Sequence, residues 1–162
     1  MTIATESVAA RTLVPEELFD RLTNRIAAEE GLPRVFAARI MDQALAFLSA
    51  CAADRASRLS PSPLVDIGWH TFILHTQEYA EFCGRVAGGY IHHVPNDGLG
   101  DHDSGVANRH AELACSVSAI VSAGLRVDPD LWTIEAASCT SGDDGCRASG
   151  KDGNENTDTN GR

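Results

Sequence analysis

The six histidines of this chain all lie between residues 70 and 110, although the chain is 162 residues long. They are His70, His75, His92, His93, His102 and His110. Imidazole is a common metal ligand, so a group of histidines near a carboxylate is a candidate metal site. The carboxylate that precedes them most closely is Asp66, in the segment VDIGWHTFILH of residues 65–75.

Asp66 and His70 are four residues apart, so they share one face of a helix at adjacent turns. His75 lies five residues beyond His70, which corresponds to about 140° around the helix axis. We therefore expect His75 to point away from Asp66, either toward solvent or toward Tyr79. Asp66 and His70 remain as a pair that needs further ligands from elsewhere in the chain.

The remaining histidines offer those ligands from two other segments. His92 and His93 are neighbours, and in an extended segment they point to opposite sides, so at most one turns inward. His110 falls on the apolar stripe of a helix expected over residues 104–123, which predicts that it faces the interior. The other members of that stripe are Val106, Leu113, Val117 and Ile120. His102, in GDHDSG, is expected in a loop.

These positions define a candidate constellation of Asp66, His70, one of His92 and His93, and additionally His110. One carboxylate with two or three imidazoles suits zinc or iron(II). An open coordination position would allow hydrolysis or oxidation, whereas a closed site would be structural. The spacing is less specific than a HExxH helix or paired CxxC knuckles.

A simpler interpretation stands beside the metal site. Asp66 could accept a hydrogen bond from the His70 ring, or it could cap the helix that follows the prolines. His110 could be a core histidine whose ring nitrogens are satisfied by hydrogen bonds. In either case the polar side chains would stabilise the fold and would bind nothing.

No motif for another chemistry is present in the sequence. GxSxG and SxxK patterns are absent, and the glycine-rich stretches lack the lysine of a phosphate loop. Whether the protein is an enzyme is therefore left open. The alternative is a non-catalytic interaction protein, which would need only a groove beside Trp69, Tyr79 and Tyr90.

The hydrophobic periodicity predicts an all-α fold of about four main helices. The predicted helices cover residues 15–31, 33–57, 65–85 and 104–123. Pro15 and the acidic residues after it are typical of a helix start, and Gly31 is typical of a helix end. Leu131 and Trp132 offer a final apolar anchor.

The chain is expected to form one compact helical domain over residues 13–137, with a flexible arm at 1–12 and a polar tail at 138–162. From Cys139 onward there is no aromatic residue and no aliphatic residue larger than alanine, so the tail is expected to be disordered. Cys139 and Cys146 leave three alternatives for that tail: a solvated end, a redox or chelating pair, or the modified part of a peptide precursor. The other three cysteines, Cys51, Cys83 and Cys115, are expected to be reduced and buried.

The composition limits the partners. A net charge of −10 argues against a nucleic-acid partner. The lack of a continuous apolar run of about 18 residues argues against a membrane span. The N-terminus lacks the pattern of a secretory signal, so the cytoplasm is the expected location. An unidentified protein or small molecule remains as the expected partner.

The block from Val65 to Pro95 resembles the glycine-rich domain-containing (GRDP-like) protein family. The positions that match its pattern are Asp66, Trp69, His70, Tyr79, Cys83 and His93. The resemblance implies a site that contains Asp66, His70 and His93 together. The family usually has a second histidine where this chain has Phe72, and it has acidic residues after its last histidine. If that missing histidine is a ligand in the family, His75 or His110 would have to replace it here.

Overall fold

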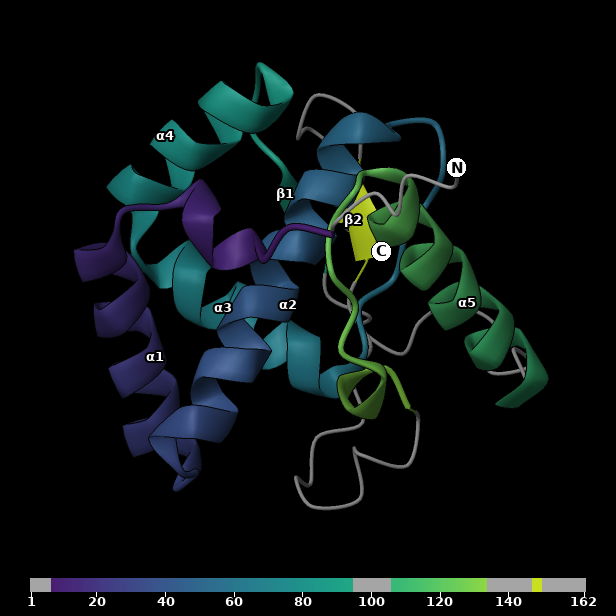
Figure 1. Cartoon of the computed structure of the whole chain (residues 1–162). Helices are drawn as coiled ribbons and strands as arrows, with labels where there is room; N and C mark the ends of the chain where they lie inside the picture. Colours follow the sequence, from purple (N-terminus) through teal and green to yellow (C-terminus); the bar gives the residue numbers. More distant parts are fainter. Residues whose placement is uncertain (1–6, 95–105, 134–146, 150–162) are drawn as a thin grey trace, which may run out of the picture.

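The structure, a computed structural model, describes residues 7–94, 106–133 and 147–149 of the chain. Within these residues it contains five α-helices, two short 3-10 helices and two three-residue strands. The helices are α1 (Glu16–Glu30), α2 (Arg34–Ala53), α3 (Pro63–Leu74), α4 (Thr76–Ala87), α5 (Val106–Ser122), η1 (Ala10–Leu13) and η2 (Pro129–Leu131), and the strands are β1 (His92–Val94) and β2 (Arg147–Ser149). The predicted all-α fold class is confirmed (Figure 1).

Helix α1 begins and ends where the sequence predicts. It follows Pro15, has Glu16 and Glu17 in its first turn, and ends at Gly31. Gly31 has a φ of 63° and its N–H bonds to the carbonyl of Ala27. Glycine adopts this left-handed conformation without a steric penalty, so the helix can end within one residue.

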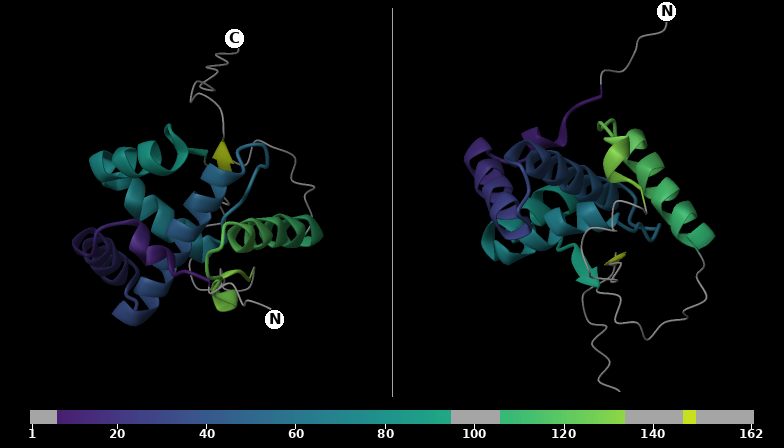
Figure 2. Two further views of the ribbon diagram at one scale, coloured as in Figure 1. Left: turned by 45° about the horizontal axis from the view of Figure 1, so that its top comes forward. Right: turned by 90° about the horizontal axis from the view of Figure 1, so that it is seen from below.

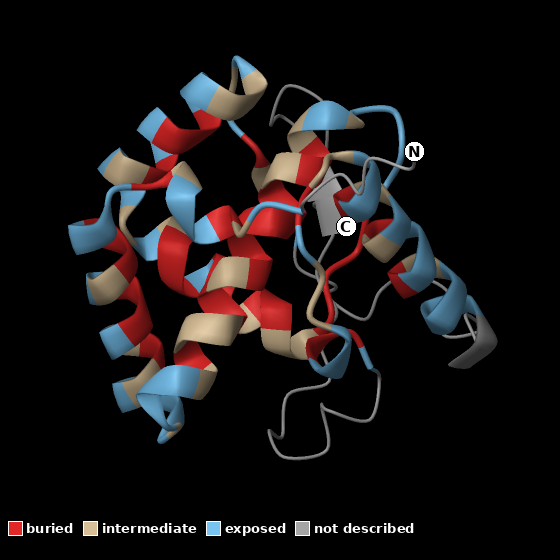
Figure 3. Ribbon diagram, in the orientation of Figure 1, coloured by how far each residue is buried: buried red, intermediate tan, exposed pale blue. Residues whose placement is uncertain are grey.

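Helix α2 is the centre of the fold. Of its 20 residues 11 are buried, and it packs against α1, α3, α4 and α5. Figure 2 shows α2 lying between α1 and α5, and Figure 3 shows buried positions along most of its length. Among the described helices α2 alone is long and apolar enough to cross a membrane, but 61% of that stretch is buried, which is the pattern of a core helix.

The helix predicted over residues 65–85 is two helices. α3 starts with Ser62 as its N-cap, since the Ser62 hydroxyl accepts a hydrogen bond from the Val65 N–H at 3.2 Å. The break falls at His75, whose φ of −89° and ψ of 66° interrupt the helical hydrogen bonds. The turn brings the rings of Tyr79 and Phe82 against Phe72, at centroid distances of 5.2 and 5.3 Å. Aromatic packing across the break therefore accompanies the change in helix direction.

Helices α2 and α3 approach each other closely at Gly68. A Cβ atom at this position would lie 2.7 Å from the Cβ of Ala44 and 3.2 Å from the carbonyl oxygen of Ile40. The first distance is well inside van der Waals contact, so only glycine fits without moving a helix. This contact fixes the position of α3, and with it Asp66 and His70, on the core helix.

The segment after α5 returns to α2 and is held there by Gln43. The Gln43 side chain donates to the carbonyl oxygen of Arg126 at 3.0 Å and accepts from the Trp132 indole N–H at 2.8 Å and the Asp128 N–H at 3.1 Å. Gln43 is buried, so these bonds satisfy polar groups that would otherwise be unpaired. Leu131 and Trp132 are buried too, which confirms the predicted apolar anchor.

Arg39 of α2 holds the same segment through hydrogen bonds. Its guanidinium donates to both carboxylate oxygens of Asp128, at 2.6 and 2.9 Å, and to the carboxylate of Asp130 at 2.8 Å. Hydrogen bonding from Arg39 lowers the pKa of Asp128 below its ordinary value. An acid with a lowered folded-state pKa stabilises the fold above its unfolded pKa of about 3.9, and this contribution is lost as the pH falls through the folded value.

We therefore expect Asp128→Asn to lower the free energy of unfolding by about 1 kcal/mol at pH 7, since the partly exposed pair is screened by solvent. The difference from wild type should disappear as the pH falls from about 4 toward 2. Urea unfolding across this pH range measures it. Asp130→Asn is the matched control, because the Asp130 side chain is 79% exposed and should contribute less. A difference that does not change with pH would show that the charge of Asp128 is not its cause.

The two strands connect the end of the chain to the middle. β1 pairs antiparallel with β2, so that His93 lies opposite Ala148. β2 belongs to the tail predicted to be disordered over 138–162. The rest of that tail, including Cys139 and Cys146, lies outside the described residues, so its expected disorder and chemistry stay predictions.

The described part of the predicted N-terminal arm contacts the body of the protein. Val8 forms a parallel bridge with Leu125, and Ala10 is buried. Residues 1–6 lie outside the described part of the chain. Among the cysteines, Cys51 and Cys83 are buried as predicted. The prediction was wrong for Cys115, which is exposed because it lines an open pocket beside Ala50 and Leu59 and is not covered by the core.

Candidate metal centre

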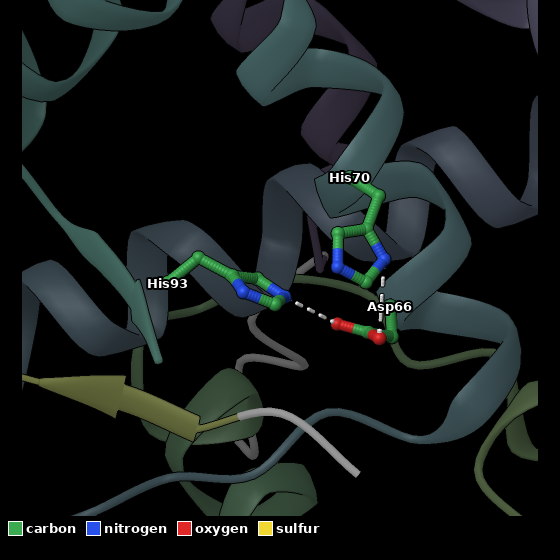
Figure 4. A group of neighbouring side chains, drawn as sticks. All are labelled: Asp66, His70 and His93. Atoms are coloured by element: carbon green, nitrogen blue, oxygen red, sulfur yellow. Dashed lines mark hydrogen bonds and ion pairs between the residues drawn. The ribbon is translucent and has the colours of Figure 1, made fainter. Parts of the chain in front are cut away.

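Three of the predicted ligands meet in the structure. Asp66 lies in the first turn of α3, His70 follows one turn later, and His93 comes from β1 (Figure 4). The Nε2 atom of His93 is 3.0 Å from Asp66 Oδ1, and the Nδ1 atom of His70 is 3.3 Å from Asp66 Oδ2. One ligand atom from each of the three residues lies within 4.8 Å of the others. We call this group the Asp66–His70–His93 cluster.

Asp66 is held at the centre of the cluster by helix geometry. Ser62 caps α3, so the alternative in which Asp66 caps the helix is not observed, and the carboxylate is available to the histidines. The positive end of the helix dipole favours a negative charge in the first turn, where Asp66 lies. The four-residue spacing then brings His70 to the second carboxylate oxygen, as the sequence predicts.

The cluster is closed on one side and open on the other. The side chains of Asp66 and His93 are 10% and 9% exposed, whereas that of His70 is 54% exposed. Burial lowers the pKa of His70, while the Asp66 carboxylate opposes and His93 reinforces that effect. This shift favours the neutral imidazole, which is the form that binds a metal.

Two aromatic rings pack against the buried His93 side chain. The Trp69 ring meets the His93 ring edge-on at a centroid distance of 4.3 Å, and the His70 and His93 rings lie 4.2 Å apart. Trp69 in turn donates a hydrogen bond to the Tyr79 hydroxyl at 2.9 Å. From the sequence, Trp69 and Tyr79 are expected to line a groove and to match the pattern of the resembled family, but their hydrogen bond is not predicted. Their role was detectable in principle, because buried indole N–H and phenol groups need partners.

The other histidines in the described part of the chain do not join the cluster. His92, on the opposite side of β1, packs against Tyr90 at a ring distance of 4.7 Å. His75 lies at the break between α3 and α4, and its Nε2 atom is buried without a hydrogen-bond partner in the described part of the chain. His102 lies outside the described residues.

The prediction that His110 faces the interior is wrong, because this residue is exposed. Leu113 and Ile120, further along the same stripe of α5, are buried. The N-terminal end of α5 extends beyond the other helices, so its first turns have no core to face (Figure 1). His110 is therefore not part of the Asp66–His70–His93 cluster.

The distances within the cluster are close to those of a metal centre. Ligands about 2.1 Å from a tetrahedral ion are about 3.3–3.5 Å from one another. The two Asp66 contacts, at 3.0 and 3.3 Å, nearly match this spacing without an ion. The ligand atoms of His70 and His93 are at most 4.8 Å apart, so a bound ion would replace the direct contacts and draw the two imidazoles together by at most about 1.4 Å, an adjustment that the exposed His70 side chain can make.

The fold and the cluster define a small, all-helical domain with a buried carboxylate shared by two histidines. The chain belongs to the UCP032817-like family, whose model matches residues 6–135. The matched region includes all three residues of the cluster and all five α-helices. Comparison with curated proteins and with solved structures found no match.

The family match corrects the resemblance to the glycine-rich domain-containing family, which is wrong. That resemblance depended on a few polar and aromatic positions within residues 65–95, whereas the family model matches residues 6–135. A Trp-His pair on a helix with a later histidine is too small a pattern to identify a family. Asp66, His70 and His93 are nevertheless close together, and this conclusion depends on the structure alone.

Proposed function

We propose that the protein binds one divalent transition-metal ion, zinc or iron(II), through Asp66, His70 and His93. The observation that supports this proposal is the convergence of three ligand atoms within 4.8 Å, two of them on side chains that are about nine-tenths buried. A carboxylate buried between two imidazoles is unusual in a core and is typical of metal centres. His93 and Asp66 would form the inner wall of the site and His70 its outer edge.

The ligand set favours an ion with exchangeable positions. Two histidines and one carboxylate fill three positions, so a tetrahedral zinc would keep one for water and a six-coordinate iron(II) would keep three. The exposed side of the site, at His70, is where such ligands would enter. A bound ion of this kind supplies a Lewis acid or an activated water, which is the chemistry of hydrolysis, and iron(II) adds oxidation.

Elemental analysis tests the proposal directly. We expect the purified full chain, loaded with zinc or iron(II) and then desalted, to retain about one ion per molecule. His70→Ala should retain much less, because one of three ligands is removed. His110→Ala is the matched control, since it removes an exposed histidine outside the cluster and should leave the metal content unchanged. Sub-stoichiometric metal in the wild type, or equal metal in wild type and His70→Ala, would contradict the proposal.

A further inference from the structure

A chain of two buried hydrogen bonds runs beside the cluster and ends at the start of β1. The Trp69 indole N–H donates to the Tyr79 hydroxyl at 2.9 Å, and that hydroxyl donates to the Ile91 carbonyl oxygen at 2.5 Å. Trp69 and Tyr79 are fully buried and Ile91 is 5% exposed. These bonds connect α3, α4 and the residues before β1.

The chemistry of the three groups determines which of them donates and which accepts in these hydrogen bonds. An indole nitrogen can only donate, so the Tyr79 oxygen accepts from Trp69 and its own proton is left for Ile91. Burial raises the pKa of Tyr79, so the hydroxyl keeps that proton at neutral pH. The Cys83 thiol is a further hydrogen-bonding partner of the Tyr79 hydroxyl and of the Ile91 backbone. Buried hydrogen bonds of this kind hold their partners firmly, because breaking one of them deprives a buried polar group of a partner.

Both residues at the ends of this pair of hydrogen bonds, Ile91 and Trp69, affect the position of His93. Ile91 precedes His93 by two residues, so fixing its carbonyl sets where the backbone of β1 starts. Trp69 contacts the His93 ring itself, edge-on at 4.3 Å and an interplanar angle of 63°. The ring is thus oriented by Trp69 while its backbone is held by Tyr79, and the Nε2 atom faces Asp66 at 3.0 Å.

We propose that Tyr79 is the positioning residue of the metal centre, and that its hydroxyl holds His93 at the distance from Asp66 that the ion requires. This inference depends on the proposed metal binding. Tyr79 does not touch the ion; it acts through the Ile91 carbonyl and through Trp69. Groups that orient metal ligands in this way typically affect metal affinity by about 10- to 100-fold.

Tyr79→Phe tests the inference, because it removes one oxygen atom and keeps the ring that packs against Phe72 and Tyr90. We expect the zinc affinity, measured by competition with a chelator, to fall about tenfold. The absorption spectrum of the cobalt(II)-loaded protein should change as well, since it reports the ligand geometry. In the metal-free protein the NMR signals of the His93 ring protons, displaced by the adjacent Trp69 ring, should move toward ordinary values.

The variant Ile26→Val is the control that distinguishes a loss of stability from a loss of His93 positioning. Ile26 is buried in α1 and takes no part in the cluster, so this variant should lower the melting temperature without changing zinc affinity or the His93 signals. An affinity for Tyr79→Phe within twofold of wild type, or an equal loss in Ile26→Val, would overturn the inference. If the wild type binds no metal, the proposed function fails, and the His93 signals of metal-free Tyr79→Phe still decide whether Tyr79 positions His93.

Discussion

Replacing His93 with alanine is expected to lower the zinc affinity of the protein about a hundredfold or more. The free energy of zinc binding at a four-ligand protein site is about 10–16 kcal/mol, or roughly 3 kcal/mol per ligand, and each 1.4 kcal/mol is a factor of ten. His93 is the ligand that should matter most, because it is buried and bonded to Asp66, whereas His70 is half exposed. Isothermal titration calorimetry with zinc measures the change.

His92→Ala provides a matched control one residue away. His92 is in the same strand, but its ring packs against Tyr90 and not against the cluster. We expect this variant to bind zinc as the wild type does. An equal loss of affinity in both variants would show that β1 and not the His93 ring is required. Unchanged affinity in His93→Ala would remove this residue from the metal centre.

Gly68→Ala is expected to destabilise the fold by about 2 kcal/mol, although alanine is the better helix former. The new methyl group would lie 2.7 Å from the Cβ of Ala44, and both atoms are fixed directly to helix backbones. α2 and α3 must therefore move apart, and overpacking of this kind costs about 1–3 kcal/mol. The gain in helix propensity, about 0.5–1 kcal/mol, offsets only part of that cost. Chemical denaturation measures the difference.

Gly84→Ala is the control for that prediction. Gly84 also lies inside a helix, α4, but it is exposed and a Cβ there would meet nothing within 4 Å. This substitution should stabilise the protein by about 0.5–1 kcal/mol, since only the propensity changes. The two glycine variants are thus expected to change stability in opposite directions. A stabilising Gly68→Ala would show that α2 and α3 can separate at little cost.

Most of the helical structure could be predicted from the sequence, because local signals mark it. Pro15 and Gly31 bound α1, and the prolines before Val65 separate α2 from α3. The break at His75 could not be predicted in this way, since no glycine or proline lies there. It accompanies packing of Tyr79 and its neighbours onto α3, which is a tertiary effect.

The candidate site could be predicted in part. Helical periodicity alone pairs Asp66 with His70, because both lie on one helix. Strand alternation shows that only one of His92 and His93 turns inward, but which one depends on how β1 docks. His110 shows the limit of periodicity, which gives the direction of a side chain around α5 but not whether other helices cover that turn.

The cluster joins a local pair of side chains to a distant one, and this has a consequence for the order in which the protein folds. Asp66 and His70 are one helical turn apart, so α3 alone can bring them together, whereas His93 lies in β1 after α4, and we expect its contact with Asp66 to form later. A metal bound by all three ligands would stabilise contacts that form late. Interactions of this kind slow unfolding more than they speed folding. A bound ion is thus expected to slow the unfolding of the domain and to have little effect on its rate of folding.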